Sequence, residues 1–373
     1  MSGDRPSPSA PSPTSQPPPS PAPLVAPRLP AEWEPHRAVW SAWPHLDYEW
    51  GAAYADARAE MAAFFAAAAH DGRGEAVRVL VLDLASDREL RAALGSAPVQ
   101  TFVGAPFGDS WLRDTGPIFV ESAGALVPVC FEFNGWGGKF DMPGDHAVAG
   151  FVAEEAHHHG ECGPPRRAPL VLEGGAIDAD GRGTVLTTRQ CCLNENRNPE
   201  LDRAAVEAAF GTWLGARRVI WLDRGLVNDH TDGHVDTLAR FVGPGKVACM
   251  RSAGRQDPNH EALEAICATL AEASDAEGRR LERVELPSPG EVKGRGGELL
   301  AASYVNFLVT NTRVLVPAYG VPSDAAAVEA LRPAFPDREV VGLSARAVVE
   351  GGGAFHCITQ QQPRGPRARG HRA

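Results

Sequence analysis

A cysteine follows a run of three glycines near the end of the chain, in the sequence Gly-Gly-Gly-Ala-Phe-His-Cys that ends at Cys357. Glycines let the backbone approach another group closely and adopt conformations that other residues resist. A thiol attacks as its thiolate, and a cationic neighbour favours that form by lowering the thiol pKa. Cys357 is therefore our candidate nucleophile. We assign a structural role to four other cysteines: Cys130, Cys162, Cys249 and Cys267.

A second polar cluster runs from Asn228 to Asp236 and contains His230 and His234. In an extended segment, residues two apart point the same way, so we expect His234 and Asp236 to face one site. A histidine can shuttle a proton near neutral pH, and a carboxylate can hold a cation. The HxxxH spacing also raises the possibility of a metal site, but Gly233 disfavours the helix that such a pair needs. We expect no metal.

Two further clusters combine carboxylates with a following glycine. The segment Asp109–Pro117 places acids, an aromatic residue and an arginine directly before an apolar strand. Glu173 follows the apolar residues 169–172 and precedes two glycines. The first cluster, taken alone, is typical of a turn at the start of a strand, with a functional site as the alternative. Glu173 is explained equally by a turn or by a carboxylate that orients a histidine.

The apolar pattern around these clusters alternates between strands and helices, which predicts an α/β fold. The expected strands are Val77–Leu82, Ile118–Val120, Ala125–Phe133, Thr184–Thr188, Arg218–Leu222, Lys246–Met250, Tyr304–Thr310 and Arg313–Pro317. The expected helices are Met61–His70, Pro199–Phe210, Glu261–Ala273 and Ser323–Leu331. Leu-Glu-Gly-Gly at residues 172–175 returns as Val-Glu-Gly-Gly at residues 349–352, as repeated strand–helix units around a central site would produce.

The two ends of the chain differ in composition from its middle. Residues 1–28 are rich in proline and serine and cannot bury enough apolar surface to fold, so we expect a disordered tail. Residues 364–373 are basic and interrupted by glycine and proline, and we expect a second disordered tail there. Residues 29–363 contain no linker, which predicts one catalytic domain.

The overall composition excludes several classes of function. A formal net charge of −11 argues against a nucleic-acid binder and favours a cationic ligand. The seven cysteines lack the spacing of a disulfide framework, which indicates a reduced, cytoplasmic protein. Proline and serine stand where a secretory signal would need an apolar core, and no apolar run approaches the length that spans a membrane.

Together these pieces resemble the agmatine deiminase family, which includes the Porphyromonas type of peptidyl-arginine deiminase and belongs to the guanidine-modifying pentein superfamily. The resemblance extends from about Leu29 to Pro363 and implies a five-bladed α/β propeller with pseudo-fivefold repeated strand–helix units. It rests on blocks in the family's order: Pro30–His36, Asp109–Pro117, Phe133–Phe140, Leu172–Ile177, Thr231–Phe241, Ala302–Phe307 and Gly351–Pro363.

The resemblance also implies the chemistry. The enzyme would hydrolyse the guanidinium of agmatine, a small cation, through a covalent amidino-cysteine, with no metal or organic cofactor. The implied roles are nucleophile for Cys357, general acid and base for His234, orientation of that histidine for Glu173, and substrate binding for Asp114, Asp236 and Trp111. Relatives form oligomers, so the resemblance also suggests a homo-oligomer.

Two departures from the family pattern leave the substrate open. Ala354 and Phe355 replace the usual Asn and Ile, and His230 stands where relatives often carry an acid that could hold a remote amine. A deiminase of free or peptidyl arginine with the same catalytic residues is therefore the alternative to agmatine. A metal-dependent hydrolase using His230 and His234 is the alternative from another class. A catalytically inactive binding module would not need every expected catalytic residue, and all are present.

Overall fold

The computed structural model describes residues 24–366, which fold into five small mixed sheets. Four sheets have three strands and the fifth has four. The strands are β1 (His36–Ala42), β2 (Ala76–Val81), β3 (Val99–Val103), β4 (Ile118–Ser122), β5 (Ala125–Glu132), β6 (Arg166–Val171), β7 (Asp178–Ala179), β8 (Thr184–Thr188), β9 (Arg218–Leu222), β10 (Ala239–Gly243), β11 (Lys246–Arg251), β12 (Glu282–Pro287), β13 (Leu308–Val309), β14 (Arg313–Ala318), β15 (Glu339–Ser344) and β16 (Gln360–Pro363).

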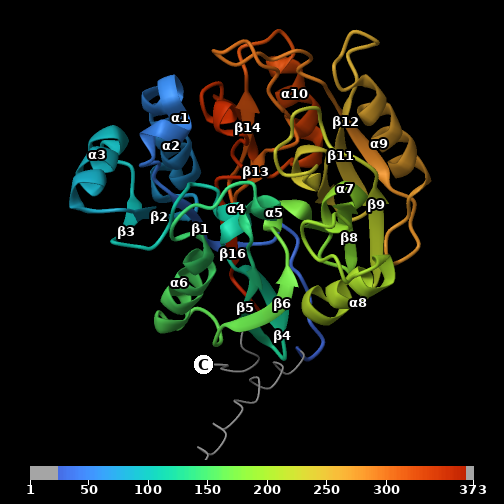
Figure 1. The fold of residues 1–373 in the computed structure, drawn as a ribbon, viewed down its shortest axis with the longest axis horizontal. Helices are drawn as coiled ribbons and strands as arrows, with labels where there is room; N and C mark the ends of the chain where they lie inside the picture. Colours follow the sequence, from blue (N-terminus) through green and yellow to red (C-terminus); the bar gives the residue numbers. More distant parts are fainter. Residues whose placement is uncertain (1–23, 367–373) are drawn as a thin grey trace, which may run out of the picture.

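The longer helices lie around the outside of the molecule, and the sheets lie toward its centre (Figure 1). The helices are α1 (Asp47–Trp50), α2 (Tyr54–Ala69), α3 (Leu84–Leu94), α4 (Leu112–Thr115), α5 (Gly135–Gly138), α6 (Asp145–His158), α7 (Arg189–Cys192), α8 (Arg203–Leu214), α9 (His260–Glu272) and α10 (Asp324–Leu331). Short 3₁₀ turns lie beside helices or between strands: η1 (Gly51–Ala53), η2 (His70–Gly72), η3 (Gly174–Ala176), η4 (Val235–Thr237), η5 (Arg332–Ala334) and η6 (Val348–Gly351).

The same order of elements recurs in every sheet. Two strands pair antiparallel, a helix follows, and the next strand pairs parallel with the second one. The connecting helices are α6, α8, α9 and α10 in four of the sheets. In the fifth sheet, β16 from the end of the described chain pairs antiparallel with β1, and α2 leads from β1 to β2. One sheet therefore contains both the first and the last strand of the described residues.

Side-chain caps fix several helix boundaries. Asp202 accepts a hydrogen bond from the backbone N–H of Ala205, and Gly215 ends α8 in a left-handed conformation. The sequence predicts a start at Pro199, but the helix begins four residues later, because Asp202 caps it. Among the described residues, no helix combines the length and the apolar character that crossing a membrane requires.

Most expected strands and all four expected helices are present, with some shifts of their ends. Thr184–Thr188 and Arg218–Leu222 match β8 and β9 at both ends. Helix α2 begins at Tyr54, seven residues before the expected Met61. The strand expected over Tyr304–Thr310 is wrong for most of its length, because only Leu308 and Val309 pair with β14.

The irregular segment before Leu308 has a physical cause. Ser303 Oγ accepts from the Val305 N–H and donates to the carbonyl of Thr237, so the backbone turns there. Asn306 Oδ1 accepts from the backbone N–H of His356. These polar side chains draw the segment toward the centre and away from strand pairing, although it is fully buried.

The expected disordered tails lie largely outside the described residues, as 1–23 and 367–373 are not described. The described residues next to them contact the domain. Arg28 and Glu121 exchange two backbone hydrogen bonds, and the Arg28 guanidinium pairs with Glu34 and Glu121. At the other end, the N–H of Arg364 donates to the carbonyl of Pro35. The packed part of the chain therefore extends beyond residues 29–363 on both sides.

Candidate functional site

The candidate residues lie in the segments that immediately precede the first strand of each sheet. Asp114 is in α4 before β4, Glu173 precedes β7, His234 and Asp236 precede β10, and Cys357 precedes β16. Each sheet begins near the centre of the molecule, so these segments meet there. The sheet of β13, β14 and β15 contributes the segment before β13. This segment contains Asn306, a residue that the sequence did not single out.

Three of these side chains pack closely around Gly175. A Cβ atom on this glycine would lie 2.5 Å from Nδ1 of His234, 2.8 Å from Oδ1 of Asp114 and 3.2 Å from Oδ2 of Asp236. Any side chain there would displace the two carboxylates and the imidazole. The second glycine of the Glu-Gly-Gly sequence is therefore explained by this close approach.

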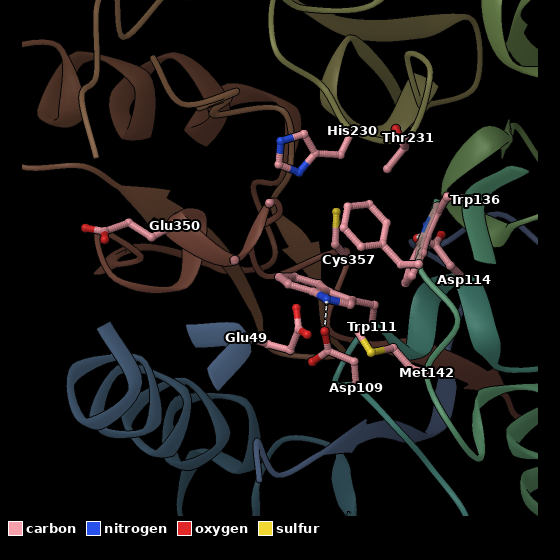
Figure 2. Close-up of a pocket in the computed structure, with 13 residues that line it drawn as sticks. Glu49, Asp109, Trp111, Asp114, Trp136, Met142, His230, Thr231, Glu350 and Cys357 are labelled. Atoms are coloured by element: carbon pink, nitrogen blue, oxygen red, sulfur yellow. Dashed lines mark hydrogen bonds between the residues drawn. The ribbon is translucent and has the colours of Figure 1, made fainter. Parts of the chain in front are cut away.

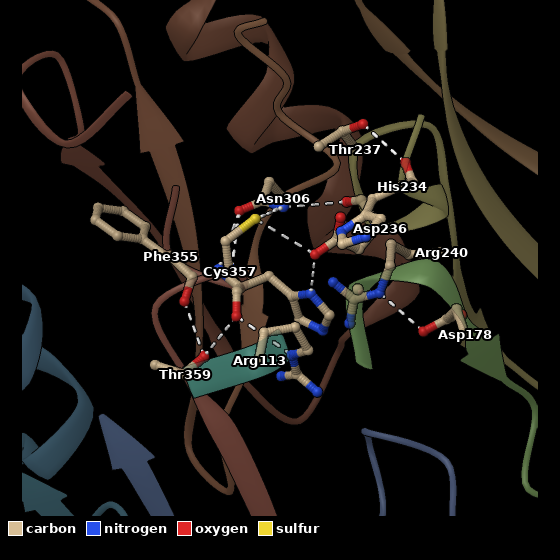
Figure 3. A network of polar contacts seen from close by, with 12 residues as sticks. Arg113, Asp178, His234, Asp236, Thr237, Arg240, Asn306, Phe355, Cys357 and Thr359 are labelled. Atoms are coloured by element: carbon tan, nitrogen blue, oxygen red, sulfur yellow. Dashed lines mark hydrogen bonds and ion pairs between the residues drawn. The ribbon is translucent and has the colours of Figure 1, made fainter. Parts of the chain in front are cut away.

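The thiol of Cys357 lies beside a carboxylate and an amide. Its Sγ is 3.5 Å from Oδ2 of Asp236 and 3.1 Å from Nδ2 of Asn306 (Figure 3). Burial, followed by the charges of Asp236 and Asp114, raises the pKa of the thiol well above its usual value. Until a cationic ligand binds, these effects favour the protonated thiol.

Asp114 is fixed by two donors and remains easy to protonate. Oδ2 accepts from Nε1 of Trp136 at 2.9 Å, and Oδ1 accepts from the N–H of Gly175 at 3.0 Å. Burial raises the pKa of Asp114 to about 6; His234 opposes this shift, while Asp236 and Glu173 add to it. Bringing carboxylates together in a buried site is unfavourable until a cation joins them.

Asp236 behaves in the opposite way, because a histidine holds it. Its Oδ2 lies 2.6 Å from Nδ1 of His356. Although burial raises the pKa of Asp236, the hydrogen bond and charge of His356 outweigh burial and lower it below the usual value. Oδ1 of Asp236 is buried and has no hydrogen-bond partner among residues 24–366. It can accept a hydrogen bond from a ligand.

His234 is buried next to these acids, with Nδ1 3.6 Å from Oδ1 of Asp114. Burial alone would lower the pKa of this imidazole, but Asp114, Cys191 and Glu173 outweigh burial and raise it well above the usual value. The expectation of an extended segment here is wrong. Thr231 Oγ1 accepts from the His234 N–H, and the chain then enters the 3₁₀ turn η4, which still brings His234 and Asp236 to one site.

Glu173 has a direct partner other than the histidine. Its Oε1 accepts from Nε of Arg197 at 2.6 Å, and the same guanidinium donates to Asp232 at 3.0 Å. Glu173 therefore acts on His234 through its negative charge rather than through a hydrogen bond to the ring. The orientation of His234 by Glu173 stays a prediction.

A pocket of about 240 Å³ opens above the thiol (Figure 2). Trp111 forms one wall; its indole stacks on Trp50 at 5.6 Å and donates to Asp109 at 2.8 Å. His230 faces the pocket near Gly352, as its sequence position suggested. The lining side chains with an acidic group are Glu49, Asp109, Asp114 and Glu350. No lysine or arginine lines the pocket in the described part of the chain.

A metal site that used both histidines is not formed. Within residues 24–366, the groups of three potential ligands do not include His230. The group that does come together is Glu173, Cys191 and His234, whose ligand atoms lie within 4.8 Å of one another. Glu173 is already bound there by the guanidinium of Arg197, which repels a cation.

Sequence reasoning missed several residues that hold the site together. Asn306 donates to the Cys357 thiol and accepts from the His356 N–H, Trp136 donates to Asp114, and Arg197 binds Glu173. Asn306 and Trp136 stand inside the blocks Ala302–Phe307 and Phe133–Phe140, which gave a signal. Arg197 lies outside every block that we used, and its contact with Glu173 could not be predicted from spacing.

Comparison with known proteins identifies a family and several relatives that this chain resembles over most of its length. The profile of the Porphyromonas-type peptidyl-arginine deiminase family matches residues 28–363. The agmatine deiminase of Stutzerimonas stutzeri is 40% identical over 360 residues, covering 90% of this chain and 95% of that protein. The agmatine deiminase of Pseudomonas aeruginosa is 38% identical over 359 residues, covering 90% and 95%. The solved agmatine deiminase of Enterococcus faecalis superposes with a TM-score of 0.83 at 34% identity, covering 91% and 96%.

Proposed function

The chain belongs to the Porphyromonas-type peptidyl-arginine deiminase family, and on that premise we propose that it is an agmatine deiminase, which hydrolyses agmatine to N-carbamoylputrescine and ammonia. The observation that carries this proposal is the pocket above Cys357. Its acidic lining, without lysine or arginine among the described residues, suits a substrate with a cation at both ends.

The guanidinium binds between Asp114 and Asp236. A guanidinium is planar, and each carboxylate can accept hydrogen bonds from its N–H groups. Its charge offsets the repulsion that raises the pKa of Asp114 and that keeps the Cys357 thiol protonated. Substrate binding therefore favours the thiolate in the position from which it attacks the guanidinium carbon.

The reaction proceeds in two halves. The thiolate of Cys357 adds to the guanidinium carbon, and the C–N bond to one terminal nitrogen breaks as His234 gives that nitrogen a proton, releasing ammonia. The carbon remains bound to sulfur as an amidino-cysteine. Neutral His234 then takes a proton from water, which adds to the same carbon, and the C–S bond breaks to give the urea product and the free thiol.

The finer features of the fold follow the same premise. We place the five sheets as the five blades of an α/β propeller, supported by the element order that recurs in each of them. All seven cysteines are unpaired, which supports a cytoplasmic enzyme. A homo-oligomer remains our proposal from the family alone.

An ammonia-release assay with matched substrates tests this function. We expect kcat/KM for agmatine to exceed that for arginine by about 100-fold or more, because the arginine carboxylate would enter a pocket lined with carboxylates. Argininamide, which lacks that negative charge, should recover part of the loss. Equal or faster turnover of arginine or of arginyl peptides would favour the alternative deiminase.

The decrease of agmatine affinity at acidic pH, the acid limb of the binding profile, provides a second test. In a Cys357→Ser variant, agmatine binding should weaken about tenfold per pH unit below pH 6, because Asp114, whose pKa is raised to about 6, becomes protonated there. Asp114→Asn in the same background should cost about 3–5 kcal/mol of binding and flatten this limb. Calorimetry from pH 5 to pH 8 measures both. An unchanged limb in Asp114→Asn would assign the titration to Asp109, whose pKa is also about 6.

A further inference from the structure

His356, the residue before Cys357, bridges two carboxylates beneath the site. Its Nδ1 lies 2.6 Å from Oδ2 of Asp236, and its Nε2 lies 2.9 Å from Oε2 of Glu32. The ring is almost fully buried, with 1% of its surface exposed. Nothing in the reaction described above uses this histidine, although it contacts a carboxylate that grips the substrate.

Two contacts with carboxylates determine the protonation of the ring. A neutral imidazole has one N–H and one lone pair, so one of its nitrogens would face a carboxylate oxygen with no proton between them. An imidazolium has two N–H groups and satisfies both carboxylates. The geometry therefore fits a buried, positively charged histidine.

Glu32 anchors this imidazolium from the side away from the substrate. Arg240 contacts Oε2 of Glu32 at 2.5 Å and pairs with Asp178 at 2.9 Å (Figure 3), and Arg113 lies 3.8 Å from the same oxygen. Burial raises the pKa of Glu32, but the charges of Arg240 and His356 outweigh burial and hold it well below its usual range. Glu32 is thus a fixed anion on which the ring can rest.

We propose that His356 is a positioning residue whose imidazolium keeps Asp236 ionised and holds its Oδ2 beside the thiol, so that Oδ1 is free to accept from the substrate guanidinium. This inference rests on the proposed function. Asn306 supports the arrangement, since its Oδ1 accepts from the His356 N–H and its Nδ2 donates to the thiol. Neighbouring residues thereby fix the positions of the Cys357 thiol, of the Asp236 carboxylate that binds the substrate, and of the imidazolium that keeps this carboxylate ionised.

The pH dependence of substrate binding distinguishes this role from simple packing. Without the imidazolium, buried Asp236 loses the partner that keeps it charged, so it should protonate at higher pH and release the substrate. The charged or titratable groups that act on Asp236 or His356 are Glu32, Arg113, Asp114, His234, Arg240 and Cys357. Expressing each affinity relative to the parent at the same pH cancels the titration that both proteins share.

The experiment measures agmatine binding by calorimetry in the Cys357→Ser parent and with His356→Gln added. We expect Kd to rise about 30-fold at pH 6 and to recover to within about threefold of the parent at pH 8, in keeping with tenfold per pH unit for one titrating group. The matched control is His36→Gln, because His36 is equally buried and pairs with Glu75 in the sheet of β1. It should leave the ratio near one.

Each other outcome has a defined meaning. A ratio that stays near one at every pH, or a loss of affinity that does not change with pH, would overturn the proposal. If the Cys357→Ser parent itself does not bind agmatine, the proposed function fails, while a second measurement still tests the histidine. Histidine-selective ¹⁵N NMR at pH 8.5 on the His36→Gln/His234→Gln variant should show one ring protonated at both nitrogens. If no such ring is seen, the inference is overturned, and this test needs neither substrate nor the His356 variant.

Discussion

Replacing Cys357 by serine is expected to lower kcat for agmatine by about four orders of magnitude or more, the scale seen when a nucleophile is removed from a covalent enzyme. The thiol lies against Asp236 and Asn306 at the floor of the acidic pocket. A serine hydroxyl ionises far less readily than a thiol, so the variant lacks a comparable nucleophile. Agmatine binding should persist, because the carboxylates of Asp114 and Asp236, which bind the guanidinium, remain.

The measurement combines turnover with intact-mass analysis. Acid-quenched wild type should carry the amidino adduct on the peptide that contains Cys357, and the serine variant should carry none. Cys130→Ser is the matched control, since Cys130 is equally buried, at 6% exposure, but lies in β5 away from the site. It should turn over normally. A Cys357→Ser enzyme with more than about 1% of wild-type activity would exclude the covalent mechanism.

Strands with buried, apolar residues could be predicted from the sequence. A strand without such a pattern, which forms only because it pairs with another strand, could not. In β8, Thr-Val-Leu-Thr-Thr, every residue is buried, and β9 ends in the buried run Ile-Trp-Leu. Both strands are rich in the β-branched and apolar residues that favour strands. In contrast, β16 is Gln-Gln-Gln-Pro, which has no strand pattern. It is a strand because β1 pairs with it, and Gln362 accepts from Nε1 of Trp40 inside the core. A buried polar strand can be recognised only when its partners are known.

The residues of the site also fall into those that the sequence predicts and those that it does not. Cys357, His234 and the acids could be proposed because each stands in a short, chemically unusual sequence. Their supports could not, because each one acts across the fold. His356 contacts Glu32 across 324 positions, and Asn306 contacts Cys357 across 51. The contact of Arg197 with Oε1 of Glu173 likewise could not be read from spacing, and the orientation of His234 by Glu173 stays a prediction.

Replacing His234 by glutamine should slow turnover by roughly 10²–10⁴-fold, the usual contribution of a positioned acid or base. Asp114, Cys191 and Glu173 outweigh the effect of burial and raise the pKa of His234 well above its usual value, so the ring is charged near neutral pH. It is then ready to protonate the departing nitrogen. Having given that proton, the ring is the base that water needs in the second half. Glutamine can do neither, although it keeps a polar group of similar reach.

Rapid-quench mass spectrometry can identify which half of the reaction is affected. If proton donation limits the variant, the adduct on Cys357 forms slowly and never accumulates; if water activation limits it, the adduct forms and persists. His230→Gln is the control, because His230 faces the same pocket but is exposed and lies outside the cluster around Asp114. It should retain both steps. Formation and loss of the adduct at wild-type rates in His234→Gln, together with a defect in His230→Gln, would transfer the acid–base role to His230.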